Sequence, residues 1–348
     1  MKTRAAILTE LNKPLMIDEI DIPDNLEYGQ VLVRVKYSGI CGSQLGEIAG
    51  AKGPDKYLPH LLGHEGGGVV EKCGAGVTNV KPGDHVVMHW RPGAGVQSAT
   101  PKYSWKGKPL NAGWVTTFNQ HAIVSENRLT AIPNDVDLKI ATLYGCALTT
   151  AHGVVTNDAS VRPGESVVIF GCGGVGISVV QMSALAGANP IIVTDVNDYK
   201  LKSALSLGAT HTINVGKEDA KARIGELLPR GADVVIETTG LKPVMEMGYE
   251  LTGNAGRIVL VGVPKADSKK ILIDSMQLHF GKRITGSHGG ESNPSYDVPR
   301  LIALQKSGRL KVDSLITKVF SLDEINKALD AVKNADVLRV AIDMGNEK

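Results

Sequence analysis

The first part of the chain consists of short runs in which hydrophobic and polar positions alternate. The N-terminal residues MKTRAAILTE lead directly into this pattern. It predicts strands at residues 31–37, 68–71, His85–His89 and His121–Ser125. Turn residues such as Pro82-Gly83-Asp84 separate the runs. Short strands joined by turns predict a compact, mostly antiparallel barrel or sandwich.

From Glu165 onward, apolar strands alternate with helical stretches. The expected strands are Val167–Phe170, 191–194, 212–214, 233–237, 258–262 and Arg283–Gly286, with helices at 175–186 and up to Gly208. This alternation predicts a parallel, doubly wound α/β sheet with helices on both faces. After Gly289-Gly290 we expect helices at 298–307 and 322–333 and a last strand at 338–343. A chain of 348 residues exceeds the usual single domain, so two domains are expected.

Composition and charge exclude several classes of function. The 38 basic and 36 acidic side chains are well mixed, which leaves a net charge of +2 and argues against nucleic acid or an anionic membrane as partner. Neither a leader-like apolar segment nor a stretch of membrane-span length is visible. The four cysteines are too few and too dispersed for a disulfide scaffold. A cytoplasmic protein with free thiols is the simplest interpretation.

A glycine-rich turn between a strand and a helix indicates a dinucleotide site. Gly171, Gly173 and Gly176 form G-x-G-x-x-G, which permits a tight turn and a close approach of a pyrophosphate to the helix N-terminus. Asp195 ends the next expected strand. A carboxylate there binds the ribose hydroxyls and repels a 2′-phosphate, so NAD is expected and not NADP.

Three dispersed residues are candidate zinc ligands: Cys41 in Gly-Ile-Cys-Gly-Ser, His64 in Gly-His-Glu-Gly-Gly-Gly, and Cys146 at the crossing into the second domain. Three thiolate and imidazole ligands suit Zn²⁺ and leave a fourth position open for catalysis. A lone cysteine is more often a small core residue, and a lone histidine is a weak signal. His60, His85, His89 and His121 are alternatives that lack the glycine-rich surroundings of His64.

Over nearly its full length the chain resembles the zinc-dependent medium-chain alcohol dehydrogenases. The matching segments are Gly63-His64-Glu65, VKPGDHV at residues 80–86, residues 146–153, the glycine turn, and LDEINKAL at residues 322–329. The resemblance implies a GroES-like catalytic domain at residues 1–148 and 288–348, and a Rossmann cofactor domain at residues 149–287. It also implies a homodimer or homotetramer that pairs through the strand Arg283–Gly286.

The same resemblance implies a role for individual residues. Cys41, His64 and Cys146 would bind one catalytic zinc, with Glu65 beside the ligand histidine and Ser43 accepting the proton of the alcohol. Thr150, Val175 and Val263 would surround the nicotinamide, and Lys200 would lie near the adenosine ribose. Arg339 would neutralise the pyrophosphate, and Trp90 would line the substrate pocket.

Two departures from the family pattern narrow this expectation. Residues 89–113 lack the four closely spaced cysteines that hold a structural zinc in many relatives, so we expect none there. Packing of Trp90, Tyr103 and Trp105 would hold this segment instead. Gly46 stands where relatives often have a relay histidine, so the proton would leave through a ribose hydroxyl, water, Gln44 or Glu47.

The expected function is therefore interconversion of an alcohol and an aldehyde or ketone with NAD. Two alternatives remain open: a zinc-free quinone- or enoyl-type reductase on the same fold, and a non-catalytic NAD-binding homologue. The sequence does not identify the alcohol.

Overall fold

The computed structural model describes residues 1–51, 53–264, 269–335 and 337–345. The chain divides into two compact units, which we describe separately. Unit 1 comprises Met1–Cys146, Asn293–Gly308 and Val312–Lys348, and unit 2 comprises Ala147–Ser292 and Arg309–Lys311. The junctions expected at 148/149 and 287/288 lie close to the observed junctions at 146/147 and 292/293.

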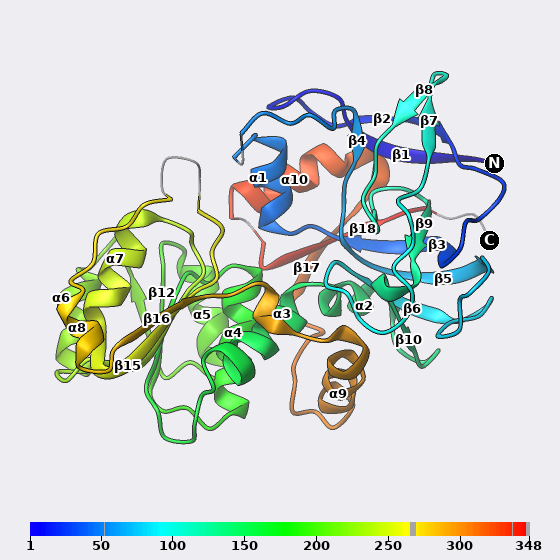
Figure 1. Ribbon diagram of the computed structural model, residues 1–348. Helices are drawn as coiled ribbons and strands as arrows, with labels where there is room; N and C mark the ends of the chain where they lie inside the picture. Colours follow the sequence, from blue (N-terminus) through cyan, green and yellow to red (C-terminus); the bar gives the residue numbers. More distant parts are fainter. Residues whose placement is uncertain (52, 265–268, 336, 346–348) are drawn as a thin grey trace. The chain divides into compact units, whose positions relative to one another are not determined.

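The described residues of unit 1 form two sheets, whose strands Figure 1 labels. In the described residues, the first sheet is antiparallel with the order β4-β1-β2-β7-β8. Its strands are β1 (Lys2–Leu8), β2 (Met16–Asp21), β4 (His60–Leu61), β7 (Tyr103–Trp105) and β8 (Lys108–Leu110). The N-terminal alternation corresponds to β1, whereas β4, β7 and β8 are too short to give a sequence pattern.

The second sheet of unit 1 has the order β10-β6-β5-β3-β18-β17, and β9 also pairs with β3. Its strands are β3 (Gln30–Gly39), β5 (Glu65–Cys73), β6 (His85–His89), β9 (His121–Ser125), β10 (Leu129–Ile132), β17 (Ile316–Ser321) and β18 (Arg339–Asp343). All of its pairings are antiparallel except that of β17 with β18. The mostly antiparallel architecture is therefore confirmed.

The helical segments of unit 1 are α1 (Gly42–Ile48), η1 (Glu126–Arg128), α2 (Leu138–Tyr144), α9 (Pro294–Lys306), η5 (Leu322–Glu324) and α10 (Ile325–Lys333). Helix α9 begins earlier than the expected residue 298. Pro294 occupies its first turn, where a missing N–H costs nothing, and Asp297 accepts a hydrogen bond from the Asn293 N–H at 2.8 Å. Pro299 lies inside the helix.

Unit 2 is a parallel sheet with helices on both faces, as expected. Its strand order is β13-β12-β11-β14-β15-β16. The strands are β11 (Val167–Phe170), β12 (Ile191–Asp195), β13 (His211–Asn214), β14 (Ala232–Glu237), β15 (Thr252–Leu260) and β16 (Arg283–Gly286). The strand order reverses between β11 and β14, and ligands of such sheets bind at the carboxyl edge of that switch point.

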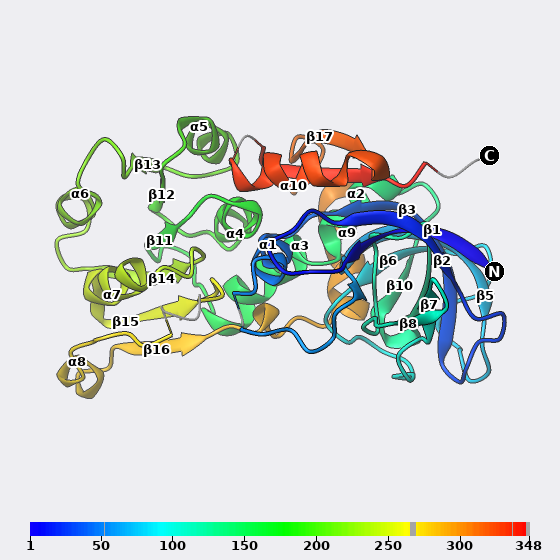
Figure 2. The same cartoon turned by 90° about the horizontal axis from the view of Figure 1, so that it is seen from above.

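Figure 2 shows α4 and α5 on one side of this sheet and α6 and α7 on the other. The helical segments are α3 (Ala147–Gly153), η2 (Val154–Asp158), α4 (Gly174–Leu185), α5 (Asp198–Ser206), α6 (Ala220–Leu227), α7 (Lys242–Leu251), α8 (Met276–His279) and η4 (Gly289–Glu291). All four residues of β11 are buried, which explains why that strand is apolar throughout and does not alternate. None of the helices in the described part of the chain is long and apolar enough to cross a membrane.

Candidate metal and dinucleotide sites

Three separate segments of unit 1 bring Cys41, His64 and Cys146 together. Cys41 directly precedes α1, His64 directly precedes β5, and Cys146 follows α2. Their ligand atoms all lie within 4.8 Å of one another, and among the described residues they form the one such group of His, Cys, Asp or Glu side chains. Residues that are far apart in the sequence thus converge at one point.

The spacing of the two thiols fits a tetrahedral metal ion. The Sγ atoms of Cys41 and Cys146 lie 3.9 Å apart. Two sulfurs that each lie about 2.3 Å from a tetrahedral zinc would be about 3.8 Å apart. Cys146 is buried, whereas Cys41 and His64 are half-buried, which leaves one side of the group accessible. The three residues therefore fit a zinc ion with an open fourth position.

Glycines allow the supporting elements to approach closely enough for this geometry. A Cβ on Gly67 would lie 2.1 Å from the carbonyl oxygen of Leu138, so the glycine lets α2 pack against β5. A Cβ on Gly145 would lie 2.5 Å from the Met88 oxygen, and Gly63 has a φ of +89°. Gly67 of the Gly-His-Glu-Gly-Gly-Gly segment thus makes room for the helix that precedes Cys146.

The charges around the group favour a thiolate. A hydrogen bond with the Cys146 thiol, together with the nearby His64 and Arg339, holds the pKa of Cys41 well below its usual value. The thiolate is the form that binds a metal. A bound cation would extend this preference to Cys146, because the positive charge stabilises both ionised sulfurs.

Glu65 lies directly after His64 and is completely buried. Its Oε1 atom accepts a hydrogen bond from a terminal nitrogen of Arg339, the first residue of β18. Burial raises the pKa of Glu65. Neither Glu65 Oε2 nor Arg339 Nε has a hydrogen-bond partner among the described residues, so both groups keep unused polar atoms.

The family resemblance predicts Glu65 beside the ligand histidine and Arg339 at the pyrophosphate. The structure shows that the two side chains form one buried ion pair, and the contact of Arg339 with a pyrophosphate stays a prediction. Gly39 makes room for the pair, because a Cβ there would lie 2.7 Å from Glu65 Oε1. The sequence alone did not identify Gly39, since a single glycine after a strand carries no distinctive signal.

Ser43 and Gln44 follow Cys41 closely in the chain, whereas Trp90 follows His89, the partner of Glu65 across β5 and β6. Ser43 is half-buried in the first turn of α1. Gln44 is 3% exposed, and its Oε1 atom has no hydrogen-bond partner among the described residues. Trp90 follows β6 and stacks against the guanidinium of Arg91 at 5.9 Å. Their roles in catalysis stay predictions.

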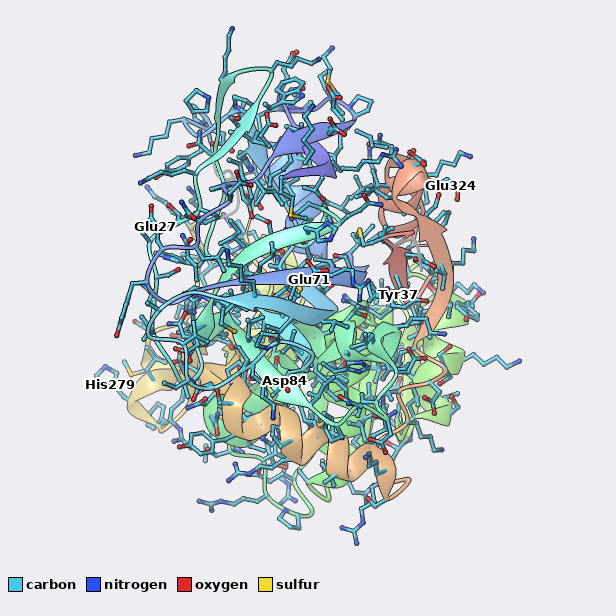
Figure 3. All side chains as sticks on the ribbon, turned by 90° about the vertical axis from the view of Figure 1, so that its right-hand side faces the viewer. Glu27, Tyr37, Glu71, Asp84, His279 and Glu324 are labelled. Atoms are coloured by element: carbon cyan, nitrogen blue, oxygen red, sulfur yellow. The ribbon has the colours of Figure 1, made fainter. Side chains whose placement is uncertain are left out.

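Three of the other histidines of unit 1 have partners of their own. The fourth, His85 on β6, has a buried Nδ1 atom without a hydrogen-bond partner among the described residues, but it belongs to no group of possible metal ligands there. His60 Nε2 lies 2.9 Å from Asp55, and His89 bonds to the Arg91 carbonyl and the Thr130 hydroxyl. His121 Nε2 lies 3.6 Å from the carboxylate of Glu71, which Figure 3 labels on β5. These contacts support His64 as the metal ligand among the candidates.

The segment at residues 89–113 is held by hydrogen bonds as well as by packing. Tyr103 is buried and its hydroxyl accepts from the Ile123 N–H at 2.7 Å, while Trp105 donates to Asp18 at 2.9 Å. The completely buried Glu126 accepts from the N–H groups of Thr78, Asn79 and Val96 at 2.6, 2.8 and 2.7 Å. The sequence did not reveal Glu126, because an isolated acidic residue usually lies on the surface.

In unit 2, the glycine turn has the geometry of a dinucleotide loop. Gly171 has a φ of +89°, Gly173 caps the N-terminus of α4, and a Cβ on Gly176 would lie 2.0 Å from the Gly171 oxygen. The three glycines therefore serve different needs: a left-handed turn, open space at the helix start, and close packing of helix on loop.

Asp195 ends β12 beside this loop. Its Oδ2 accepts from the Cys172 N–H at 2.7 Å, and its Oδ1 accepts from the Asn197 N–H at 2.9 Å. Each oxygen retains a further lone pair for a ribose hydroxyl. Cys172 is buried, and burial raises the pKa of its thiol to about 12, so it fills space as an inert side chain.

The remaining cofactor residues lie on separate elements of unit 2. Thr150 on α3 is 5% exposed, and its hydroxyl has no hydrogen-bond partner among the described residues. Val175 lies in the first turn of α4, Lys200 is buried on α5, and Val263 is 64% exposed after β15. An unpartnered buried hydroxyl and an exposed valine are both typical of surfaces that a ligand covers.

Known proteins match both units. Residues 27–134 match the alcohol dehydrogenase GroES-like domain family, and residues 174–307 match the zinc-binding dehydrogenase family. An NDMA-dependent alcohol dehydrogenase of Amycolatopsis methanolica is 32% identical over 374 residues, which cover 98% of this chain and 99% of that protein. An S-(hydroxymethyl)glutathione dehydrogenase of Paracoccus denitrificans is 32% identical, with 98% and 100% covered.

Solved structures give the same result. A zinc-binding-domain alcohol dehydrogenase protein from Burkholderia ambifaria superposes with a TM-score of 0.90 at 30% identity, covering 99% of this chain and 100% of the other. Benzyl alcohol dehydrogenase from Acinetobacter calcoaceticus superposes with a TM-score of 0.88 at 26% identity, with the same coverage. The likeness extends over both units and is not confined to the cofactor fold.

Proposed function

We propose that this chain, which belongs to the zinc-type medium-chain alcohol dehydrogenase family, interconverts an alcohol and an aldehyde or ketone with NAD. The observation that carries the proposal is the 3.9 Å spacing of the Cys41 and Cys146 sulfurs beside His64. It supplies the metal-binding geometry that a zinc-free reductase on this fold would not need. The family membership and the fold expected from the sequence are thus confirmed.

Cys41, His64 and Cys146 would hold one catalytic zinc. When bound, the ion supplies Lewis-acid chemistry, which lowers the pKa of an alcohol or polarises a carbonyl. Glu65 directly follows His64 in the chain, and its ion pair with Arg339 joins the starts of β5 and β18, two strands of one sheet, so that it fixes the backbone at the start of β5. Residues that orient a metal ligand in this way tune the site without touching the substrate.

Ser43 would accept the proton of the alcohol, since it lies two residues after Cys41, in the first turn of α1. The proton then has no histidine at position 46 to receive it, and it leaves through water, a ribose hydroxyl, Gln44 or Glu47. Trp90 would narrow the pocket near the metal and restrict the size of the substrate.

Unit 2 would bind NAD. The N–H groups at the start of α4 receive the pyrophosphate, and Asp195 receives the ribose hydroxyls. Lys200 would lie near the adenosine ribose, and Thr150, Val175 and Val263 near the nicotinamide, while Arg339 would neutralise the pyrophosphate. A second phosphate on the ribose would meet the carboxylate of Asp195, which favours NAD over NADP.

The substrate is a small primary or secondary alcohol, or a hydroxyl presented by a sugar or polyol. Relatives named S-(hydroxymethyl)glutathione dehydrogenase are as similar in sequence as those named alcohol dehydrogenase. A thiol–formaldehyde adduct therefore belongs in any substrate panel beside the simple alcohols.

The oligomer would form through β16, the edge strand of the unit 2 sheet. Leu272, Met276 and Phe280 are 82%, 58% and 65% exposed in the segment before it. An unpaired strand edge beside exposed apolar side chains is suited to pairing with a second copy. We propose a cytoplasmic homodimer or homotetramer. Each subunit would hold one zinc, because residues 89–113 lack the cysteines that a structural zinc would need. Light scattering and the zinc-to-subunit ratio test these two statements.

The decisive experiment combines metal analysis with a substrate panel. After extensive dialysis the purified protein should retain about one zinc per subunit and should reduce NAD with at least one alcohol, polyol or thiol–formaldehyde adduct. A metal-free protein that reduces quinones or enones would favour the zinc-free alternative. A protein that binds zinc and NAD but turns over nothing in the panel would favour a non-catalytic role.

A further inference from the structure

A completely buried carboxylate lies at the end of the central strand β14. Glu237 is 0% exposed, and its side chain accepts hydrogen bonds from the Thr239 N–H, the Thr239 hydroxyl and the Gly240 N–H. Burial raises the pKa of this carboxyl group. An apolar residue would occupy such a place at lower cost, so the three bonds indicate that the turn after β14 must be held in one conformation.

This turn lies at the switch point of the sheet. Glu237 stands in register with Phe170, the residue before the glycine loop, and with Leu260 at the end of β15. Its position is therefore at the carboxyl edge between β11 and β15, over which a bound dinucleotide passes.

One side of the turn supports the glycine loop. The Thr238 N–H and hydroxyl both donate to the Phe170 carbonyl, at 2.9 and 2.8 Å, and the hydroxyl also lies 3.2 Å from the Gly171 carbonyl. A Cβ on Gly171 would lie 2.8 Å from the Thr238 hydroxyl, so the turn and the loop pack without spare room.

The other side of the turn contacts the segment after β15. A Cβ on Gly240 would lie 2.5 Å from the Val263 oxygen, and a Cβ on Gly262 would lie 2.1 Å from the Gly240 nitrogen. The Gly262 N–H also donates to the backbone carbonyl of Glu237 at 3.0 Å. The turn thus separates the loop expected at the pyrophosphate from the segment expected at the nicotinamide.

We propose that Glu237 is a positioning residue for the dinucleotide: by holding Thr239 and Gly240 it sets the spacing between the glycine loop and the Gly262–Val263 segment. This inference rests on the proposed binding of NAD to unit 2. Glu237 does not touch the cofactor itself. Its effect passes through backbone that contacts both halves of the ligand.

The test compares Glu237→Ala with Glu237→Gln. The Gln oxygen can replace Oε1, which accepts all three bonds, whereas Ala removes every acceptor. Glu237→Ala should weaken NAD and NADH binding at least about tenfold, since several hydrogen bonds are lost, while Glu237→Gln should stay within about threefold of the parent protein. AMP, which spans only the adenosine half of the site, should lose much less affinity than NAD in Glu237→Ala.

Asp233→Ala provides a matched control. Asp233 lies near the amino end of the same strand, where its carboxylate accepts from the N–H and hydroxyl of Ser166 at 2.8 and 2.7 Å. It should lower the thermal midpoint without changing NAD affinity. Should Glu237→Ala fail to fold, Thr238→Val tests the same link by removing the hydroxyl contact with the glycine loop, with an expected loss of about threefold.

Unchanged NAD affinity in a folded Glu237→Ala protein would overturn the inference. So would an equal loss for AMP and NAD, or a Gln variant as weak as the Ala variant. Zinc content should stay unchanged in all variants, because the metal ligands belong to unit 1. If the parent protein itself binds no NAD, the proposed function fails, and that outcome is distinct from any result with the variants.

Discussion

The metal group of unit 1 and the glycine loop of unit 2 are built on opposite principles. Cys41, His64 and Cys146 supply three side chains from three distant segments, and their chemistry resides in sulfur and imidazole atoms. The glycine loop supplies backbone N–H groups from one continuous segment, and its function depends on the side chains it lacks. The first site should therefore lose metal binding when a ligand side chain is removed. The second should lose dinucleotide binding when a Cβ atom is added to one of its glycines.

The largest effect should come from removing a metal ligand. Cys146→Ala or His64→Ala should abolish zinc binding and lower alcohol oxidation by more than about 1,000-fold, because the metal stabilises charge by several kcal/mol. NAD binding should survive. Zinc analysis, steady-state kinetics and NAD titration measure the three quantities. Cys73→Ser is the matched control, and a variant that loses both zinc and NAD binding would contradict the separation of the two sites.

His89, which lies outside the Cys41–His64–Cys146 group, should affect the pH dependence of stability and not the activity. Burial lowers the pKa of His89 to about 4, and its Nε2 lies 2.9 Å from the Thr130 hydroxyl. The unfolded chain takes up the proton near pH 6.5, whereas the folded protein resists it until about pH 4. The contribution of His89 to the free energy of unfolding should therefore fall by roughly 3 kcal/mol as the pH drops from about 6.5 to about 4, and it should change little at lower pH. Urea unfolding of the parent and His89→Gln proteins checks this, and identical pH dependence would refute it.

Adding one methyl group should damage the glycine loop. In Gly176→Ala the Cβ would lie 2.0 Å from the Gly171 oxygen, so helix and loop must separate. An overpacking cost of about 1–3 kcal/mol corresponds to a roughly 5- to 150-fold loss of NAD affinity. Zinc content should not change. Gly225→Ala, where a Cβ meets nothing within 4 Å, should bind NAD normally.

The proposed preference for NAD over NADP depends on the side chain of Asp195. Asp195→Ala should weaken NAD about tenfold or more, because bonds from the ribose hydroxyls to a carboxylate are lost, and should leave NADP nearly unchanged. Asp195→Asn separates two effects, since the amide oxygen can still accept from the Cys172 N–H. Equal weakening of NAD and NADP in both variants would show that Asp195 only supports the loop.

The glycine loop could be predicted from local sequence patterns more fully than the metal ligands could. Both the strand–turn–helix context of the glycine loop and the alternation in unit 2 are local patterns, so the strands near 167, 191 and 283 could be predicted closely. The ligand set depended on a family resemblance, because Cys41, His64 and Cys146 are individually ordinary. Gly39, Glu126 and Glu237 could not be predicted, since their importance comes from neighbours that are distant in sequence.

The smallest effect concerns the missing relay at Gly46. A Cβ at this position would meet only Ala51 Cβ at 3.7 Å, an ordinary contact, and the residue lies within α1, so a side chain can be added without strain. Gly46→His should place an imidazole one helical turn from Ser43. If proton exit limits the rate, turnover below neutral pH should rise a few-fold, since general acid–base groups titrating near pH 6.5 act best there. Gly46→Ala controls for helix propensity. The His and Ala variants could instead give the same pH–rate profile. That result would show that water or the cofactor ribose already carries the proton as fast as the chemistry requires. The metal site would then need no relay residue on α1.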